Sequence, residues 1–113
     1  MLFGKKKGRV PVSKIPKDWD AGYKAGYPLW EKGEVERKAG NYQEAIDLFD
    51  QARNVGYFAP ALYKSYAMTY RKLKDKESEI AILEEGIARF KSAKGNYETG
   101  LRDLREQLNK ARK

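Results

Sequence analysis

The chain has 113 residues, 41% of them hydrophobic, which is enough for one modest core and not for a second. It contains 24 Lys and Arg against 16 Asp and Glu, and the formal net charge of +8 favours anionic partners. Cysteine and histidine are both absent. Disulfide bonds, thiol catalysis, histidine acid–base chemistry and the commonest metal ligands are therefore excluded.

The excess positive charge lies at the N-terminus. Residues 1–17 carry six basic residues and no acidic one, which leaves 18 basic against 16 acidic residues in the remainder. Gly, Pro and Lys dominate this segment, so we predict a solvated, flexible arm, with contact to nucleic acid or to an anionic membrane surface as the alternatives. The residues that would contact an anion are Lys5, Lys6, Lys7 and Arg9.

The first residues are basic but lack the long apolar run of a signal peptide, and no stretch is apolar enough to span a membrane. A cytoplasmic location is the default expectation.

From Pro28 onward, helical patterns alternate with short breakers, and no convincing two-residue alternation occurs. We therefore predict one all-α domain over residues 18–113. Pro28 fits the first turn of a helix over 29–39, which Gly40 ends. Residues 18–27 are harder to assign, because two glycines oppose a helix while three aromatic residues require burial or a partner. We expect a short helix or turn here that folds back over the first helix pair.

The second predicted helix runs from Tyr42 toward Gly56, where a left-handed backbone would end it. A third begins near Pro60, a fourth follows Asp75 as its N-cap, and a last helix covers residues 97–112. Their apolar faces predict the core: Tyr42, Ala45, Ile46, Leu48, Phe49, Ala52, Leu62, Tyr63, Tyr66, Ala67, Tyr70, Ile80, Leu83, Ile87, Phe90, Tyr97, Leu101, Leu104 and Leu108. The aromatic residues that this assignment leaves free of the core are Trp19, Tyr23, Tyr27, Trp30, Tyr57 and Phe58.

Two stretches resemble the two helices of a tetratricopeptide repeat. The run Gly40-Asn41-Tyr42 followed by Ala45, Phe49 and Ala52 is similar to the second helix of that repeat, and Tyr63, Tyr66-Ala67 and Tyr70 are similar to the first. The resemblance implies antiparallel helix hairpins stacked as a short α-solenoid. Its register gives repeats over 26–59 and 60–93 and a capping helix within 94–113. A helical bundle without repeats is the alternative.

Three charged residues depart from the repeat pattern. Lys32, Glu36 and Glu79 stand where the family prefers apolar or small residues. They indicate looser helix packing at these points, or faces open to water.

The resemblance also implies where a ligand would bind, because proteins of this family usually hold it in the groove lined by the first helix of each pair. The corresponding residues are Tyr27, Trp30, Arg37, Lys38, Lys64, Met68, Arg71, Lys72, Arg102 and Arg105. The set is mostly basic and suits an acidic or carboxylate-bearing peptide. The alternative is an ordinary solvated helix surface.

No nucleophile stands near a base, no glycine-rich phosphate loop precedes a helix, and no carboxylates have metal-ligand spacing. We therefore predict no catalytic residues, no cofactor, no metal and no enzymatic activity. The expected function is a protein-interaction module that binds a partner segment or another copy of itself. The alternative is a nucleic-acid-binding accessory protein that uses the basic arm and the basic helix faces.

Overall fold

The computed structural model describes residues 19–93 and 95–113. The basic arm, with Lys5, Lys6, Lys7 and Arg9, lies outside the described residues. The described part contains no strand and has five helices: α1 (Trp19–Lys38), α2 (Tyr42–Asn54), α3 (Pro60–Lys72), α4 (Lys76–Ser92) and α5 (Glu98–Arg112). The predicted all-α class is confirmed.

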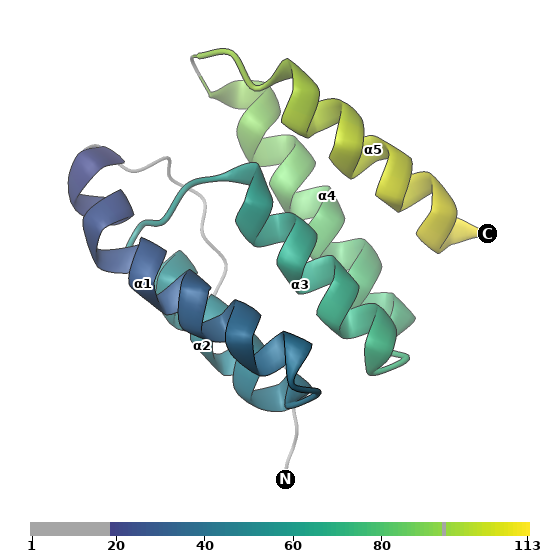
Figure 1. Ribbon diagram of the computed structural model, residues 1–113. Helices are drawn as coiled ribbons and strands as arrows, with labels where there is room; N and C mark the ends of the chain where they lie inside the picture. The colour runs from purple at the N-terminus through teal and green to yellow at the C-terminus, as the bar shows by residue number, and fades with distance from the viewer. Residues whose placement is uncertain (1–18, 94) are drawn as a thin grey trace, which may run out of the picture.

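Successive helices are joined by short turns and run antiparallel (Figure 1). The most extensive contacts lie between α1 and α2, between α3 and α4, and between α4 and α5. Helices α1, α3 and α5 lie side by side across the surface that faces the viewer in Figure 1, while α2 and α4 lie behind α1 and α3.

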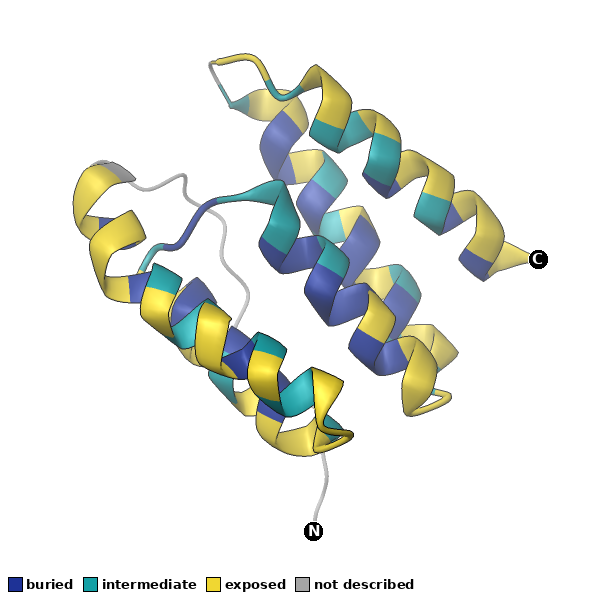
Figure 2. Cartoon of the chain, viewed as in Figure 1, coloured by how far each residue is buried: buried dark blue, intermediate teal, exposed yellow. Residues whose placement is uncertain are grey.

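The core lies between these helices, and buried residues occupy their inner sides (Figure 2). Tyr63, Tyr66 and Phe49 are among its largest fully buried side chains. The whole predicted face of α3 is buried. On α4, however, the fully buried isoleucine is Ile82, whereas the predicted Ile80 and Ile87 are only partly buried and pack at the edge of the core.

Two aromatic residues predicted to be free of the core are in fact part of it. Tyr57 and Phe58, in the turn between α2 and α3, are only 4% and 3% exposed. Phe58 stacks on Phe90 with a centroid distance of 4.3 Å, and Tyr57 packs beneath α1 at Gly26. A turn shows no hydrophobic period, so the pattern could not reveal that this one passes through the interior.

Helix α1 begins much earlier than predicted, and Pro28 lies inside it rather than in its first turn. The glycines that opposed a helix are required by its packing. A Cβ at Gly22 would collide with the backbone carbonyl of Gly56, and one at Gly26 would collide with the Tyr57 side chain. Pro28 cannot donate a hydrogen bond to the Lys24 carbonyl, and both residues lie on the exposed side of the helix.

The predicted helix ends agree with the structure. Gly40 and Gly56 have positive φ angles of 88° and 97°, the left-handed backbone that glycine adopts without strain. Asp75 caps α4, because its carboxylate accepts a hydrogen bond of 3.1 Å from the Ser78 backbone N–H.

A buried polar network connects α2 with α3 and α4. Arg53 donates two hydrogen bonds of 2.7 Å to the carboxylate of Glu85, and the Arg53 side chain is only 1% exposed. The Tyr63 hydroxyl donates to Glu85 at 3.0 Å and accepts a bond of 2.7 Å from Arg89. The network pairs the Arg53 charge, which would otherwise be costly in the interior, although Nη1 of Arg53 is buried without a hydrogen-bond partner.

Glu79, one of the charged departures from the repeat pattern, is buried rather than open to water. It is 5% exposed and accepts a hydrogen bond of 3.2 Å from Arg71. In the part of the chain that the structure describes, no helix combines the length and the apolar character needed to cross a lipid bilayer.

Candidate functional site

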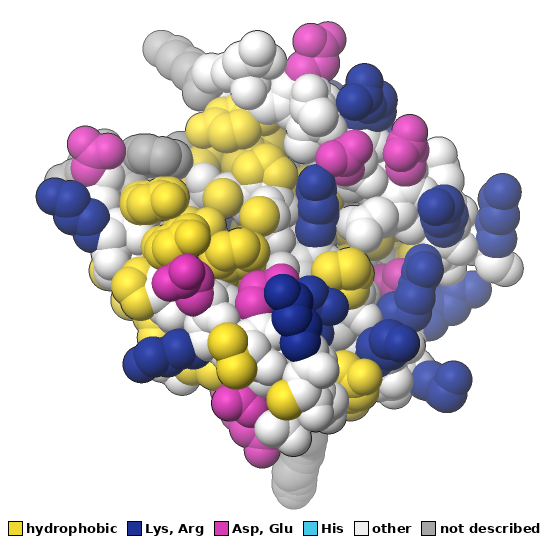
Figure 3. Space-filling model, in the orientation of Figure 1, with side chains coloured by type: hydrophobic (Ala, Val, Ile, Leu, Met, Phe, Trp, Pro, Cys, Tyr) yellow, Lys and Arg dark blue, Asp and Glu magenta, His cyan; other side chains and the backbone are white. Residues whose placement is uncertain are grey.

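Helices α1, α3 and α5 together form one surface, which we call the open face. Figure 3 shows that hydrophobic side chains gather over α1 and the start of α3, whereas Lys and Arg gather over the far ends of α3 and α5. The face is therefore apolar at one end and basic at the other.

The apolar end is built on three aromatic residues of α1, here called the aromatic cluster: Tyr23, Tyr27 and Trp30. Their spacing of four and three residues places them on one side of the helix. Tyr23 stacks on Tyr27 with centroids 5.2 Å apart, and Tyr27 lies 5.5 Å from Trp30. Tyr57 supports all three from below, at 5.8 to 6.2 Å. Tyr23 is 39% exposed and the other two are partly exposed, so the cluster presents aromatic surface to solvent.

Trp30 is held in place by a contact between helices. Its indole Nε1 donates a hydrogen bond of 3.0 Å to the hydroxyl oxygen of Ser65 on α3, a residue that is 2% exposed. A buried indole N–H requires such a partner, and this one fixes the ring orientation. The cluster is therefore largely pre-formed.

Two tyrosines of this region have a raised pKa. Burial, followed by repulsion from Tyr23, Tyr27 and Glu31, raises the pKa of Tyr57 to about 12. The charge of Glu31 is the first cause, and burial the second, of the raised pKa of Tyr27. Both hydroxyls therefore stay protonated at neutral pH.

A hollow of about 360 Å³ follows α1 beyond the cluster, lined by Tyr27, Trp30, Glu31, Glu34, Val35 and Lys38. Of its two acidic residues, Glu34 is already engaged, because Arg37 donates two hydrogen bonds of 2.8 and 2.9 Å to its carboxylate. Burial raises the pKa of the Glu34 carboxyl, but hydrogen bonds from Arg37 and Ser65, with the charges of Arg37 and Lys38, lower it to below its usual value. Glu34 is therefore ionised and paired, and it is no candidate for a general base.

Helix α3 contributes the middle of the open face. Lys64 lies 2.8 Å from the Asp103 carboxylate of α5, and its hydrogen bond and charge lower the pKa of Asp103. Met68, one turn along α3, is 38% exposed. Lys64 thus ties α3 to α5, while Met68 offers a flexible apolar contact.

The structure brings together only part of the residue set implied by the repeat register. Tyr27, Trp30 and Lys38 line the α1 hollow, and Lys64 and Met68 lie on α3. Two of the remaining residues form ion pairs within the protein, Arg37 with Glu34 and Arg71 with Glu79. The other three are exposed: Lys72, Arg102 and Arg105.

On α5 the residues facing α3 include Gly100, which lies against Pro60, and Asp103, which pairs with Lys64; the register selected neither. A helix turns by about 100° per residue, so Arg105 lies on the opposite side of α5 from Asp103, and Arg102 is also turned outward. Sequence reasoning also omitted Tyr23 and Ser65 from the set. Tyr23 precedes Tyr27 by four residues, a signal that was present, but nothing in the sequence pairs Ser65 with Trp30.

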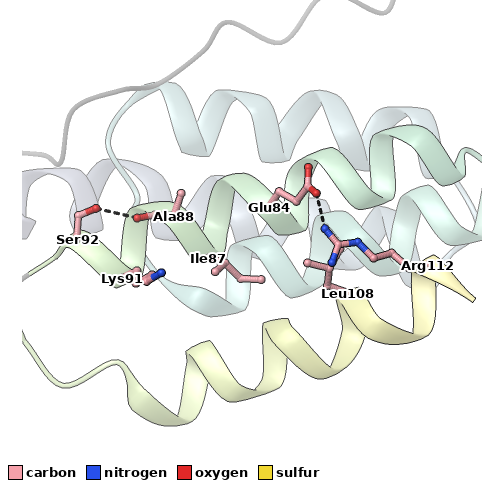
Figure 4. Close-up of a pocket in the computed structure, with 7 residues that line it drawn as sticks. All are labelled: Glu84, Ile87, Ala88, Lys91, Ser92, Leu108 and Arg112. Atoms are coloured by element: carbon pink, nitrogen blue, oxygen red, sulfur yellow. Dashed lines mark hydrogen bonds and ion pairs between the residues drawn. The ribbon is translucent and has the colours of Figure 1, made fainter.

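A second hollow, of about 600 Å³, lies between α4 and α5 (Figure 4). Ile87 and Leu108 lie between the two helices, and the ion pair of Glu84 with Arg112, at 2.7 Å, closes one end. Ser92 uses its hydroxyl to bond the Ala88 carbonyl at 2.8 Å. Lys91 is the remaining charged side chain of the lining, so the groove offers one cation beside an apolar floor.

Among the described residues, no group of three or more potential metal-binding side chains is close enough together to hold a metal ion. The open face offers aromatic surface, a thioether and paired charges, which suit contact with another molecule. No protein-family model, no curated protein and no solved structure matches this chain.

Proposed function

We propose that this protein is a non-enzymatic interaction module, a short tetratricopeptide-like stack whose open face binds a segment of a partner protein. The aromatic cluster is the observation that carries the proposal. Tyr23, Tyr27 and Trp30 are partly exposed, and Trp30 is held by Ser65 before any partner arrives. Rigid aromatic side chains contribute much of the binding energy at protein interfaces at a low cost in entropy.

The arrangement of the helices supports the repeat interpretation. The register makes α1, α3 and α5 equivalent first helices, and these three lie side by side on one surface. The predicted first-helix positions of α3, Tyr63, Tyr66, Ala67 and Tyr70, are all buried between the pairs.

The charges near the aromatic cluster favour a protein partner over nucleic acid. Glu31 and Glu34 line the hollow beside the aromatic cluster, and Asp103, paired with Lys64, adds a carboxylate between α3 and α5. A phosphate backbone along this surface would meet these carboxylates, whereas a peptide with an apolar segment would not be repelled.

The proposal is tested by isolating partners from the source cells with and without nuclease and then measuring the affinity of the purified partner by calorimetry. Replacing Tyr23 and Tyr27 together by alanine should weaken binding by at least about tenfold, because both lose exposed aromatic surface. Val55, which is 44% exposed at the end of α2, provides the control. Its replacement by alanine should change the affinity by less than about twofold.

Both variants should keep the helical circular dichroism spectrum of the original chain. Unchanged affinity in the double variant would remove the open face as the binding surface. Partners that disappear after nuclease treatment would favour the nucleic-acid alternative instead.

A further inference from the structure

The basic end of the open face contains a hollow of about 470 Å³ that we call the basic basin. It is lined by Arg71, Lys74, Lys76, Glu79, Lys110, Ala111 and Lys113. We propose that the basic basin docks a run of acidic side chains belonging to the partner segment that binds the open face. This inference rests on the proposed function, because it takes the occupant to be a protein segment.

The basin concentrates positive charge far above the average of its surroundings. Outside residues 1–17 the chain has 18 basic and 16 acidic residues, yet five cations and a single carboxylate line this hollow. The cations come from the end of α3, the turn after it, the start of α4 and the end of α5, and the fold brings them together. Opposite charge collected in this way attracts and orients an anionic partner.

Most of these cations are not neutralised within the protein. Glu79 is buried and bonds Arg71, which leaves no carboxylate of the described residues in an ion pair with Lys74, Lys76, Lys110 or Lys113. The neighbouring Asp75 bonds the Ser78 backbone N–H as a helix cap. Four lysines therefore remain available to an acidic ligand.

The backbone at Lys74 provides independent support. The turns after α1, α2 and α3 have the same pair of backbone hydrogen bonds, and their left-handed positions are Gly40, Gly56 and Lys74. Lys74, with φ of 59°, is the only residue other than glycine with positive φ in the described chain. Glycine suits this position better than any residue with a Cβ, and such strain is found preferentially at functional sites. Here the unfavourable residue adds a cation to the basin.

The chemistry of the lining favours a peptide over single-stranded nucleic acid. Lysines act as separate, flexible point charges that can meet several carboxylates, and the single guanidinium, that of Arg71, is already engaged with Glu79. No aromatic side chain lines the basin, so it offers no platform on which bases would stack. The partner segment we infer has an apolar part at the aromatic cluster and an acidic part at the basin.

The test measures binding of fluorescein-labelled hexaglutamate to the purified chain by fluorescence anisotropy at low ionic strength. The Lys74→Gly/Lys110→Gln variant removes two basin charges while glycine keeps the turn geometry. The control, Lys24→Gln/Lys32→Gln, removes the same charge from exposed positions on α1, a helix that does not contact α5. We expect about tenfold weaker binding for the basin variant and less than about twofold for the control.

Equal losses in the two variants would overturn the proposal, because net charge alone would then explain binding. Tighter binding of labelled hexathymidylate than of hexaglutamate, with the same dependence on the basin, would also overturn it, since the basin would then be a nucleic-acid site. Thermal melts of both variants verify that they are folded.

The two proposals fail separately. If the tyrosine double variant keeps its partner while hexaglutamate still requires the basin, the proposed binding face is wrong; the basin then binds acidic side chains, but not those of a segment held on the open face. If the tyrosine variant loses its partner while the basin variant retains hexaglutamate, the basin inference is wrong and the proposed function stands.

Discussion

The two helix pairs of this protein are packed by different means. In the α1–α2 pair, Gly22, Gly26 and Gly33 of α1 bring its backbone against α2 and the turn that follows. In the α3–α4 pair, large aromatic residues of α3 such as Tyr63 fill the interface, and only Gly86 of α4 makes room for them. The first interface thus relies on three glycines, which admit the Gly56 carbonyl and the Tyr57 and Phe49 side chains, whereas the second relies on one.

This difference accounts for the polarity of the open face. Because glycines of α1 form its contact with α2, the aromatic residues of α1 are not buried in that contact. Tyr23, Tyr27 and Trp30 therefore reach the surface. The aromatic residues of α3 are buried in the core, and the outer side of α3 carries Lys64 and Lys72 instead. The apolar and basic ends of one surface thus follow from how each first helix is packed.

The largest loss of stability should come from breaking the polar network that joins the first helix pair to the second. In Glu85→Ala the Arg53 guanidinium loses both of its 2.7 Å bonds, while its side chain is only 1% exposed. Removing one partner of a buried ion pair costs about 3–5 kcal/mol, because a charge is left buried without compensation. Urea unfolding followed by circular dichroism measures this loss.

The adjacent acid provides a matched control. Glu84 pairs with Arg112, but both side chains are about half exposed, at 51% and 53%. An exposed pair contributes about 1 kcal/mol or less, so Glu84→Ala should change the free energy of unfolding by no more than that. Equal losses for the two variants would mean that burial does not set the strength of the network.

A substitution in the glycine interface of the first pair should cause a smaller loss of stability. In Gly33→Ala the new Cβ would collide with the Phe49 ring, which is fully buried and cannot retreat without moving its neighbours. Overpacking costs about 1–3 kcal/mol, and the better helix propensity of alanine returns up to about 1 kcal/mol. We expect a net loss of about 1–2 kcal/mol in the same urea experiment.

Lys32, the preceding residue, is exposed, and Lys32→Ala should stay within about 0.5 kcal/mol of the original chain. A Gly33→Ala variant more stable than the original would show that α1 does not depend on close backbone approach.

Local patterns predicted most of the fold because α2 to α5 obey local rules. Gly40 and Gly56 end their helices, and Asp75 caps α4, as expected from each residue's own chemistry. Residues 18–27 were expected to form a separate short helix or turn, because glycine and proline oppose helices locally, by about 1 and 3 kcal/mol per residue, whereas α1 runs unbroken from Trp19 to Lys38. The contacts of Gly22 and Gly26 with the turn after α2 override that preference, and they exist only in the folded chain.

The parts of the candidate site that lie on a single helix could be predicted from the sequence. The repeat register selected Tyr27 and Trp30 on α1 and Met68 on α3, and the structure places all three on the open face. It could not fix the rotation of α5, which meets α3 through Gly100 at Pro60 and through Asp103 at Lys64. The basic basin joins lysines from distant segments, so no local pattern contains it: Lys74, Lys76, Lys110 and Lys113.

The smallest predicted change in stability is a gain rather than a loss. Lys74 occupies the left-handed position that glycine fills in the turns after α1 and α2. Lys74→Gly should therefore stabilise the protein by about 1 kcal/mol, because a residue with a Cβ is strained there. Lys72→Gly, in the last turn of α3, should instead destabilise it by about 1 kcal/mol, since glycine is a poor helix former. The same substitution two residues apart thus separates backbone strain from loss of charge in thermal melts, and loss of stability in both variants would show that Lys74 supports the fold rather than the basin.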